Sequence, residues 1–445
     1  MKTTFTPVLI EPTDVLFFRD SIPMSAGQGR GHGCRLPWPS TLHEAFRSTL
    51  LLADGDLRPA KAATGRHLGS RSRRELGRGA PAGVSAYREA RGQTQVATTA
   101  YQSLRILGPF PWLEPDEQNP NRLAGLFLPV PLDAQVSEDN HIHPLELLPH
   151  QAAGSSVPHL PCVPVSPVPA SKKMRLGWWT PAQYDAYLKG ELQADLAPLP
   201  DSAFWAAEHR IGLEIEPDTS AAKSGQLYSG AYLRPRKELR LAAWTSLVHP
   251  RDTEAERLAK LPFLLLGGER RLARLWPGLD TPLPGAPVAV GDGPCLLKWT
   301  LITPAVFAHG WLPGWCQDNS AQQRPAGEVC LRLPGRARLV GSCLGKPTPF
   351  AGWDAVDGTP KETRLAVPAG SVYYFLCDSA PTANALIALL HCDLHSAAFG
   401  PRSDFFGEKG FGCGLCSMKV SLHHKVGLDR TSADVPALAN ELFNC

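Results

Sequence analysis

Three short glycine-rich stretches have basic residues beside them, and that combination suits the binding of phosphate groups. Glycine lets a backbone amide approach a phosphate closely, and arginine can add a pair of parallel hydrogen bonds. The stretches are residues 27–33, 267–268 and 407–414. The neighbouring cations are Arg19, Arg30 and Arg35 for the first, Arg270 and Arg271 for the second, and Lys409 for the third. A polynucleotide backbone is therefore a candidate ligand, and the alternative is that these are ordinary surface loops.

Two other residues of these loops can contact bases. Phe411 can stack on an unpaired base, or it can pack on its own loop. Glu269 cannot bind phosphate, so we expect it to orient Arg270 or to accept a hydrogen bond from a base. The predicted RNA-binding residues are Arg19, Arg30, Arg35, Ser40, Thr41, Arg47, Arg71, Arg73, Arg74, Gly267, Gly268, Glu269, Arg270, Arg271, Lys409, Gly410, Phe411 and Gly412.

The first glycine loop leads into a predicted helix. Ser40 or Thr41 is expected to begin this helix, and Thr41 with Glu44 fits a capping box. The amides at such an end favour an anion, and Arg47 borders it. The glycines match no nucleotide-binding fingerprint, since the sequence has neither a phosphate loop ending in Lys-Ser/Thr nor a suitable βαβ unit.

Residues 58–91 form a strongly basic stretch with hardly any apolar periodicity. Its cations are Arg58, Lys61, Arg66, Arg71, Arg73, Arg74, Arg78, Arg88 and Arg91, against Glu75 and Glu89. We expect a mobile arm or an extended hairpin that neutralises phosphates. A solvated basic loop is the alternative.

One histidine suggests a different function. His32 lies between Gly31 and Gly33 and could act as a general acid or base in metal-independent RNA cleavage. No Tyr, Lys or Ser stands at a convincing spacing to assist it. We therefore predict no catalytic residue and keep the endonuclease as the alternative function. A scaffold that contacts only protein would leave the basic stretch unexplained.

The cysteines raise the question of a metal. The chain has 11 of them, and buried free thiols are the default expectation in a cytoplasmic protein. Cys413 and Cys416 are spaced as zinc ligands often are. Further candidate ligands nearby are Cys392, His395, His423 and His424. The spacing matches no known zinc module, so we predict no metal and no cofactor and leave zinc as an open alternative.

The composition limits the classes of function only loosely. The chain has 445 residues, a hydrophobic content of 43% and a net charge of +3. This length suggests two or three domains, and so mild a charge neither requires nor excludes nucleic acid. No apolar run approaches the ~20 residues that a membrane span needs. The first residues also lack the apolar segment of a signal peptide, so we expect a cytoplasmic protein with no membrane partner.

Many short β-prone segments and few convincing helices indicate an α+β fold. Expected strands cover residues 8–18, 210–216, 227–233, 239–248, 296–307, 338–344 and 367–376. Expected helices cover residues 41–53, 181–189, 253–266 and 381–396, and residues 108–111 should end an ambiguous element at 95–107. Residues 301–307 (LITPAVF) are similar to residues 9–17 (LIEPTDVLF), which hints at two copies of one architecture.

Several segments together resemble the Cmr-type RAMP proteins, specifically the subunit of the type III-B CRISPR effector complex that holds the 5′ handle of the guide RNA. The segments are residues 9–12 with 16–20, 36–41 with 45–47, 108–110 with 128–131, 212–215, 266–270, 352–354 and 367–373. They are spread over most of the chain, and their joint order is specific. Cys413 and Cys416 depart from the pattern of the family.

The resemblance implies two tandem ferredoxin-like (RRM-like) domains with long loop insertions. The first would cover residues 1–205, with the basic arm 58–91 and a proline-rich insertion at 144–170; the second would cover residues 206–445, with the glycine-rich loop 407–414. It implies a non-catalytic subunit that binds crRNA, docks the large palm-domain subunit and backbone RAMP subunits, and meets target RNA indirectly, in antiviral defence. The superfamily also includes metal-independent CRISPR RNA endoribonucleases, which are the alternative.

Overall fold

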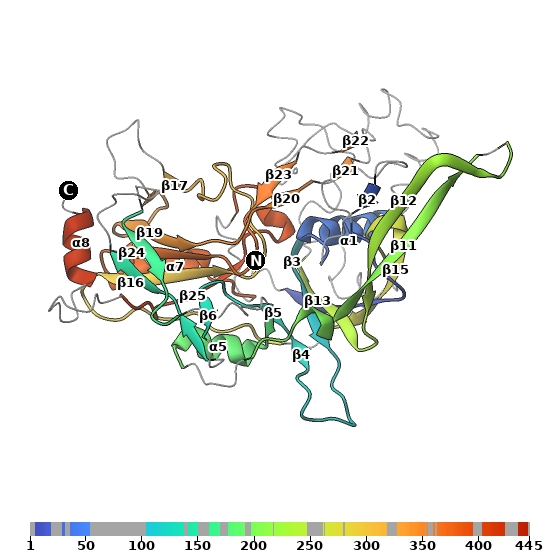
Figure 1. Cartoon of the computed structure of the whole chain (residues 1–445). Helices are drawn as coiled ribbons and strands as arrows, with labels where there is room; N and C mark the ends of the chain where they lie inside the picture. The colour runs from blue at the N-terminus through green and yellow to red at the C-terminus, as the bar shows by residue number, and fades with distance from the viewer. Residues whose placement is uncertain are drawn as a thin grey trace.

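The computed structural model describes most of the chain. The described residues are 5–18, 29–31, 36–53, 104–137, 141–149, 160–169, 177–191, 197–216, 218–246, 261, 263–278, 281–317, 327–351, 353–354, 359–360, 363–394, 403–422 and 435–443. They form two main sheets and a long hairpin. Figure 1 shows the two sheets side by side, with the hairpin extending from the right-hand one.

The first sheet has six strands in the order β14-β15-β1-β13-β3-β4, and every neighbouring pair is antiparallel. The strands are β1 (Thr6–Pro12), β3 (Arg105–Leu113), β4 (Gly125–Leu126), β13 (Leu239–Ser246), β14 (Phe263–Leu266) and β15 (Arg271–Pro277). β1 is central: Ile10 lies opposite Leu241 on one side and Leu275 on the other.

The helix α1 (Pro39–Ala53) covers one face of this sheet. Leu42, Phe46 and Leu50 recur every fourth residue, so they share one side of the helix and are buried against Ile10 and Ile106. Burying each of these large side chains contributes about 1.5–3 kcal/mol. The helix begins at Pro39, slightly earlier than predicted, because proline suits the first helical position.

The second sheet also has six strands, in the order β17-β18-β19-β24-β16-β25. They are β16 (Cys295–Leu301), β17 (Cys316–Gln317), β18 (Glu328–Val329), β19 (Ala337–Cys343), β24 (Val372–Cys377) and β25 (Gly414–Ser417). The helix α7 (Ala380–Leu390) packs Leu386 and Leu390 onto this sheet. It ends earlier than predicted because His391 forms a β-bridge with Gly414.

Four strands of each sheet follow the same order. The chain order β1, β3, β13, β15 gives the spatial order β15-β1-β13-β3, and the chain order β16, β19, β24, β25 gives β25-β16-β24-β19. The similar segments at residues 9–17 and 301–307 therefore begin on strands that occupy corresponding places, β1 and β16. The prediction of a mixed fold built mostly on antiparallel sheets is confirmed.

The first sheet takes strands from both sides of the predicted domain boundary at 205/206. β13, β14 and β15 all follow residue 206, yet they pair with β1 and β3. The chain passes from one sheet to the other within residues 278–294, between β15 and β16. A boundary at 205/206 would therefore divide the strands of one sheet between two domains.

Two successive segments between β4 and β13 lie outside the first sheet, and we call them the first and the second excursion. The first contains the helix α5 (Pro181–Lys189), which has the predicted bounds, with Thr180 as its N-cap and Gly190 as its C-cap. The other is a hairpin of β11 (Trp205–Ile215) and β12 (Ala222–Pro235), to which β2 (Gly29–Gly31) adds a third, parallel strand. The remaining elements are β5 (Leu128–Pro129), β6 (Ala134–Val136), β7 (Ile142–Pro144), β8 (Glu146–Pro149), β9 (Cys162–Val165), β10 (Trp178–Trp179), β20 (Thr348–Phe350), β21 (Trp353–Asp354), β22 (Thr359–Pro360), β23 (Arg364–Ala366), η1 (Asp201–Ala203), η2 (Gly268–Arg270), η3 (Gly407–Lys409) and α8 (Val435–Phe443).

A fully buried polar cluster joins the first excursion to the second sheet. The Asp133 carboxylate accepts hydrogen bonds from the hydroxyls of Tyr187 and Tyr374 and from the Lys298 ammonium, whose Nζ lies 3.4 Å away. All four side chains are at most 2% exposed. Burial lowers the pKa of Lys298, and the charge of Asp133 opposes that shift.

Residues 108–111 do not end an element, contrary to prediction, because β3 runs through them. Gly108 and Pro109 together face Ala243, so the pairing contains a bulge that requires no donor from the proline. Gly108 has a φ of 112°, and a side chain there would lie 2.9 Å from the carbonyl of Ala242.

Within the described ranges, no helix combines the length and the apolar character needed to cross a membrane.

Candidate nucleic-acid interface

Two of the three glycine stretches lie at corresponding places in the two sheets. Each comes just before the last of the four shared strands, β15 or β25, and contacts the segment that follows the first. The amide of Gly268 donates to the Phe17 carbonyl at 2.7 Å, and that of Gly412 donates to the Pro304 carbonyl at 2.7 Å. Both stretches therefore have an internal structural role, which sequence reasoning did not anticipate.

The bend at Gly267 and Gly268 is closely packed. Gly267 has a φ of 76°, and a Cβ there would lie 2.6 Å from the Phe17 carbonyl oxygen. The Phe17 ring in turn stacks on Tyr232 of the hairpin, with 4.7 Å between ring centroids. The bend, the segment after β1 and the hairpin thus meet at one place.

Residues 409–414 of the third stretch are buried, so the contacts with RNA that were predicted for residues 409–412 are wrong. Phe411 is 0% exposed and lies parallel to Trp38, with Phe350 and Phe406 in the same cluster, so it offers no face to a base. The amides of Gly410, Phe411 and Gly412 all donate to carbonyls of this chain. They are not free to hold a phosphate.

Lys409 is likewise committed within the protein. It is 4% exposed and forms an ion pair with Glu44 of α1, so the predicted phosphate contact is contradicted. The predicted capping box of Thr41 and Glu44 is also wrong. Thr41 lies inside α1, where its amide donates to the Trp38 carbonyl at 2.9 Å.

Part of the first glycine stretch forms a strand rather than a phosphate-binding loop. Gly29, Arg30 and Gly31 pair in parallel with residues 228–230 of β12. Arg19, His32 and Arg35 lie outside the described residues, as does the basic arm with Arg71, Arg73 and Arg74. Residues 29–31 therefore lie along the hairpin.

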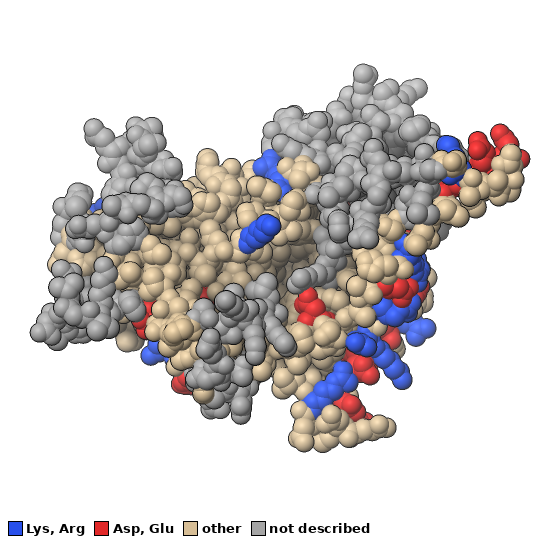
Figure 2. All heavy atoms as spheres, in the orientation of Figure 1, with Lys and Arg blue, Asp and Glu red and all other residues tan. Residues whose placement is uncertain are grey.

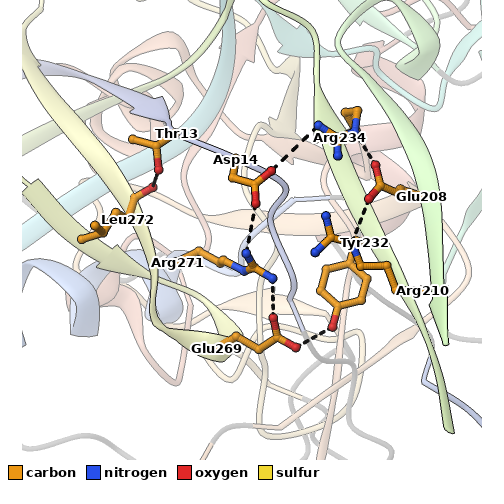
Figure 3. A network of polar contacts seen from close by, with 9 residues as sticks. All are labelled: Thr13, Asp14, Glu208, Arg210, Tyr232, Arg234, Glu269, Arg271 and Leu272. Atoms are coloured by element: carbon orange, nitrogen blue, oxygen red, sulfur yellow. Dashed lines mark hydrogen bonds and ion pairs between the residues drawn. The ribbon is translucent and has the colours of Figure 1, made fainter. Parts of the chain in front are cut away.

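A network of charged side chains surrounds the meeting point of bend and hairpin (Figure 3). Arg271 lies between two carboxylates, donating to Asp14 at 3.0 Å and to Glu269 at 2.5 Å. Tyr232 donates its hydroxyl to the same Glu269 at 2.5 Å. Glu269 therefore orients Arg271; the side chain of Arg270 is not among those that the structure describes.

The network continues along the hairpin with charges that alternate in sign. Glu208 accepts from Arg234 and, at 2.8 Å, from Arg210, and these hydrogen bonds lower the pKa of Glu208 to about 2. Arg234 also lies 3.9 Å from Asp14. The three arginines and three carboxylates balance. Figure 2 shows the same mixture of signs at the right of the view, over the hairpin side of the molecule.

Sequence reasoning missed most members of this network. Of its charged residues only Glu269 and Arg271 were predicted as site residues, while Arg210, Arg234 and Asp14 were not. A usable signal existed for β11, because strand alternation places Glu208 and Arg210 on one face. Nothing local indicated that Asp14 would lie beside them.

Ser40, Thr41 and Arg47 are half-buried residues of α1. Their neighbour His43 is 5% exposed, with its Nε2 3.3 Å from the Leu104 carbonyl. Burial lowers the pKa of His43 to about 3, and the nearby charges of Lys409 and Arg47 act in the same direction. The imidazole is therefore neutral in the folded protein near pH 7.

We expect stability to fall as the pH drops from about 6.5 to about 3, in part because the unfolded chain protonates His43 and the folded chain does not. Replacing His43 by glutamine should reduce the pH slope of the denaturation midpoint in that window by the equivalent of up to about one proton. Denaturant titrations at several pH values measure this. Identical slopes in the two proteins would contradict the assignment.

The cysteines with zinc-like spacing lie inside the protein. Cys392, Cys413 and Cys416 are at most 3% exposed, and the amide of Cys416 donates to Nδ1 of His391 at 3.0 Å. Among the described residues, no group of three or more His, Cys, Asp or Glu side chains could hold a metal. His395, His423 and His424 lie outside those residues.

Comparison with protein families assigns the chain to a class, the RAMP-like subunits of CRISPR effector complexes. The family model described as "CRISPR-associated protein (Cas_Cmr3)" matches residues 8–389, and the chain belongs to that family. The match extends from β1 into α7 and so includes strands of both sheets. The resemblance to Cmr-type RAMP proteins is thereby confirmed.

Solved structures of type III complexes contain similar chains. One, from "Cryo-EM structure of the Type III-B Cmr-beta bound to cognate target RNA", is 16% identical with a TM-score of 0.44, over 94% of this chain and 98% of that chain. Another, from "Crystal structure of Csm3-Csm4 subcomplex in the type III-A CRISPR-Cas interference complex", is 9% identical with a TM-score of 0.35, over 84% and 94%. A search of the curated proteins finds no match.

Proposed function

We propose that this chain is the non-catalytic subunit of a type III-B effector complex that holds the 5′ handle of the guide RNA. The observation that carries the proposal is the family match over residues 8–389. In this function the chain also docks the large palm-domain subunit and backbone RAMP subunits. It meets target RNA only through the guide.

The strand order supports a pair of ferredoxin-like units. In that fold a βαββαβ chain places its fourth strand beside the first, with the third between the first and second. β15-β1-β13-β3 and β25-β16-β24-β19 both follow this order. The first unit would then include residues up to Pro277, and the second would begin at Cys295.

The RNA-contacting surface would lie where the hairpin meets the bend at Gly267 and Gly268. Pairing with residues 228–230 brings residues 29–31 to the hairpin, next to the part of β12 that carries Tyr232 and Arg234. The residues that we retain for phosphate or sugar contacts are Arg19, Arg30, Arg35, Ser40, Thr41, Arg47, Arg71, Arg73, Arg74, Arg270 and Arg271. Gly267 and Gly268 support the surface through their packing on Phe17.

The basic arm provides a direct test. We expect a variant with Arg71, Arg73 and Arg74 changed to glutamine to bind a handle RNA with a weaker salt dependence. Each lost phosphate contact reduces the slope of log K against log salt by about 0.7 for a single strand, so three contacts give a change of about 2. Fluorescence anisotropy at four or five salt concentrations measures the slope.

A matched control changes three exposed cations elsewhere, Lys189, Arg332 and Lys346, to glutamine. This control has the same net charge as the arm variant and should keep the slope of the unmodified chain. Equal slopes for the arm variant and the control would exclude the arm as a phosphate contact. A purified effector complex whose RNA lacks a uniform 5′ end would contradict the proposed function itself.

A further inference from the structure

The face of the first sheet that α1 leaves uncovered carries an exposed apolar patch at β14 and β15. Along β15, Leu272 and Trp276 are 47% and 48% exposed, whereas Ala273 between them is buried beneath α1. On β14, Phe263 is 43% exposed and lies directly opposite Arg274. We call Phe263, Leu272, Arg274 and Trp276 the β14–β15 patch. Neighbouring large apolar side chains exposed on this scale indicate an interaction site.

The ring of Trp276 is held in a fixed orientation. Its Nε1 donates to Glu11 at 2.7 Å, and Glu11 also forms an ion pair with Arg240 at 3.2 Å. The polar tip of the indole is thus satisfied while half of the side chain stays exposed. A side chain already fixed in this way loses little conformational entropy when a partner binds it. A recess lined by Leu9, Trp112 and Ala242 continues the same face.

Arg274 is the uncompensated charge of the patch. Glu11 lies directly opposite it on β1, but that carboxylate is already bound by Arg240 and Trp276. Within the described ranges, the exposed Arg274 guanidinium has no hydrogen bond or ion pair. An unpaired guanidinium surrounded by large apolar side chains is complementary to a carboxylate on an apolar surface.

We propose that the β14–β15 patch docks another protein subunit of the effector complex, one that presents apolar side chains to Phe263, Leu272 and Trp276 and a carboxylate to Arg274. Trp and Arg supply much of the binding energy at protein interfaces. The inference rests on the proposed function as part of a complex. It adds the surface and the chemistry of the partner.

The charges around the patch favour protein over RNA. Next to Trp276, Glu11 and Glu114 both form ion pairs with Arg240. The two carboxylates and the one guanidinium together carry a net charge of about −1. Among the described residues of the patch, Arg274 alone offsets this, and phosphate binding needs a clear excess of positive charge. The patch is dominated by apolar side chains, as the centre of a protein interface is.

Photo-cross-linking in the assembled complex tests the partner. A benzophenone amino acid replaces Leu272 in the full chain, and the complex is purified with its guide RNA before irradiation. We expect a cross-link to a peptide of a different subunit that contains Asp or Glu. Cross-links to RNA, or none beyond those of the same probe at Leu365, which is 56% exposed on β23, would overturn the proposal.

Substitutions give an independent measure. R274E and W276A should each lower retention of the cross-linked subunit in pull-downs about tenfold or more at equal amounts of folded protein. Reversing the partner's acidic residue should restore retention by R274E, and R332E serves as the control. Undiminished retention by both variants would overturn the proposal. Handle-RNA binding should stay unchanged, so loss of RNA binding by every form would count against the proposed function and not against the docking surface.

Discussion

Replacing Asp133 by alanine is expected to lower the free energy of unfolding by about 3–5 kcal/mol. The substitution leaves the Lys298 ammonium, which is 2% exposed, without its carboxylate. It also removes the acceptor of the Tyr187 and Tyr374 hydroxyls. Because Asp133 joins residues of the first excursion to β16 and β24, the loss should appear as a lower thermal and denaturant midpoint for the second sheet.

A double-mutant cycle separates the lost charge pair from lost packing. Lys298→Met on its own removes the buried ammonium, so adding Asp133→Ala should cost much less there than in the unmodified chain. Asp292→Ala, at an exposed carboxylate, serves as the control and should change stability by less than about 0.5 kcal/mol. Equal losses for Asp133→Ala and Asp292→Ala would show that the buried cluster does not contribute to stability.

Replacing Gly410 by alanine is expected to cost about 2–5 kcal/mol, from left-handed strain together with overpacking. Gly410 has a φ of 96°, and a Cβ there would lie 2.4 Å from the carbonyl oxygen of Ile106, a buried residue of β3. The added methyl group therefore presses the loop away from β3, and the cluster of Phe411 and Trp38 moves with it. Thermal unfolding of the purified variant measures the effect.

The same loop supplies its own control. A Cβ on Gly407 would meet no atom within 4 Å, so Gly407→Ala should keep both stability and RNA affinity. If Gly407→Ala lost RNA affinity at unchanged stability, the loop would contact RNA directly, contrary to the burial that we observe. Gly410→Ala should lose affinity only as far as it loses folded protein.

Structural features that are determined by residues close together in the sequence were predicted well. The helix predicted at residues 181–189 is α5, and the strand predicted at residues 210–216 is the second half of β11. The segments that resemble the Cmr-type RAMP proteins led to the right family. Each of these signals is a short pattern whose physical meaning is fixed within a few residues.

Features that depend on residues far apart were not predicted. Lys409 looked like a free cation, yet its partner Glu44 lies 365 residues earlier in the chain. Phe411 looked exposed among glycines, but the rings of Trp38 and Phe350 that bury it come from separate segments. A glycine loop that approaches backbone and one that approaches phosphate have the same sequence signature, and only the surrounding packing distinguishes them.

The order of the strands in the first sheet limits when that sheet can form during synthesis of the chain. β1 is synthesised early, but its neighbours on both sides, β13 and β15, are complete only when the ribosome has reached Ser246 and Pro277. Until then both edges of β1 lack their partner strands. Unpaired strand edges promote aggregation, which chaperones commonly limit. A truncated gene product ending at residue 205 would contain β1 and β3 without the strand that lies between them.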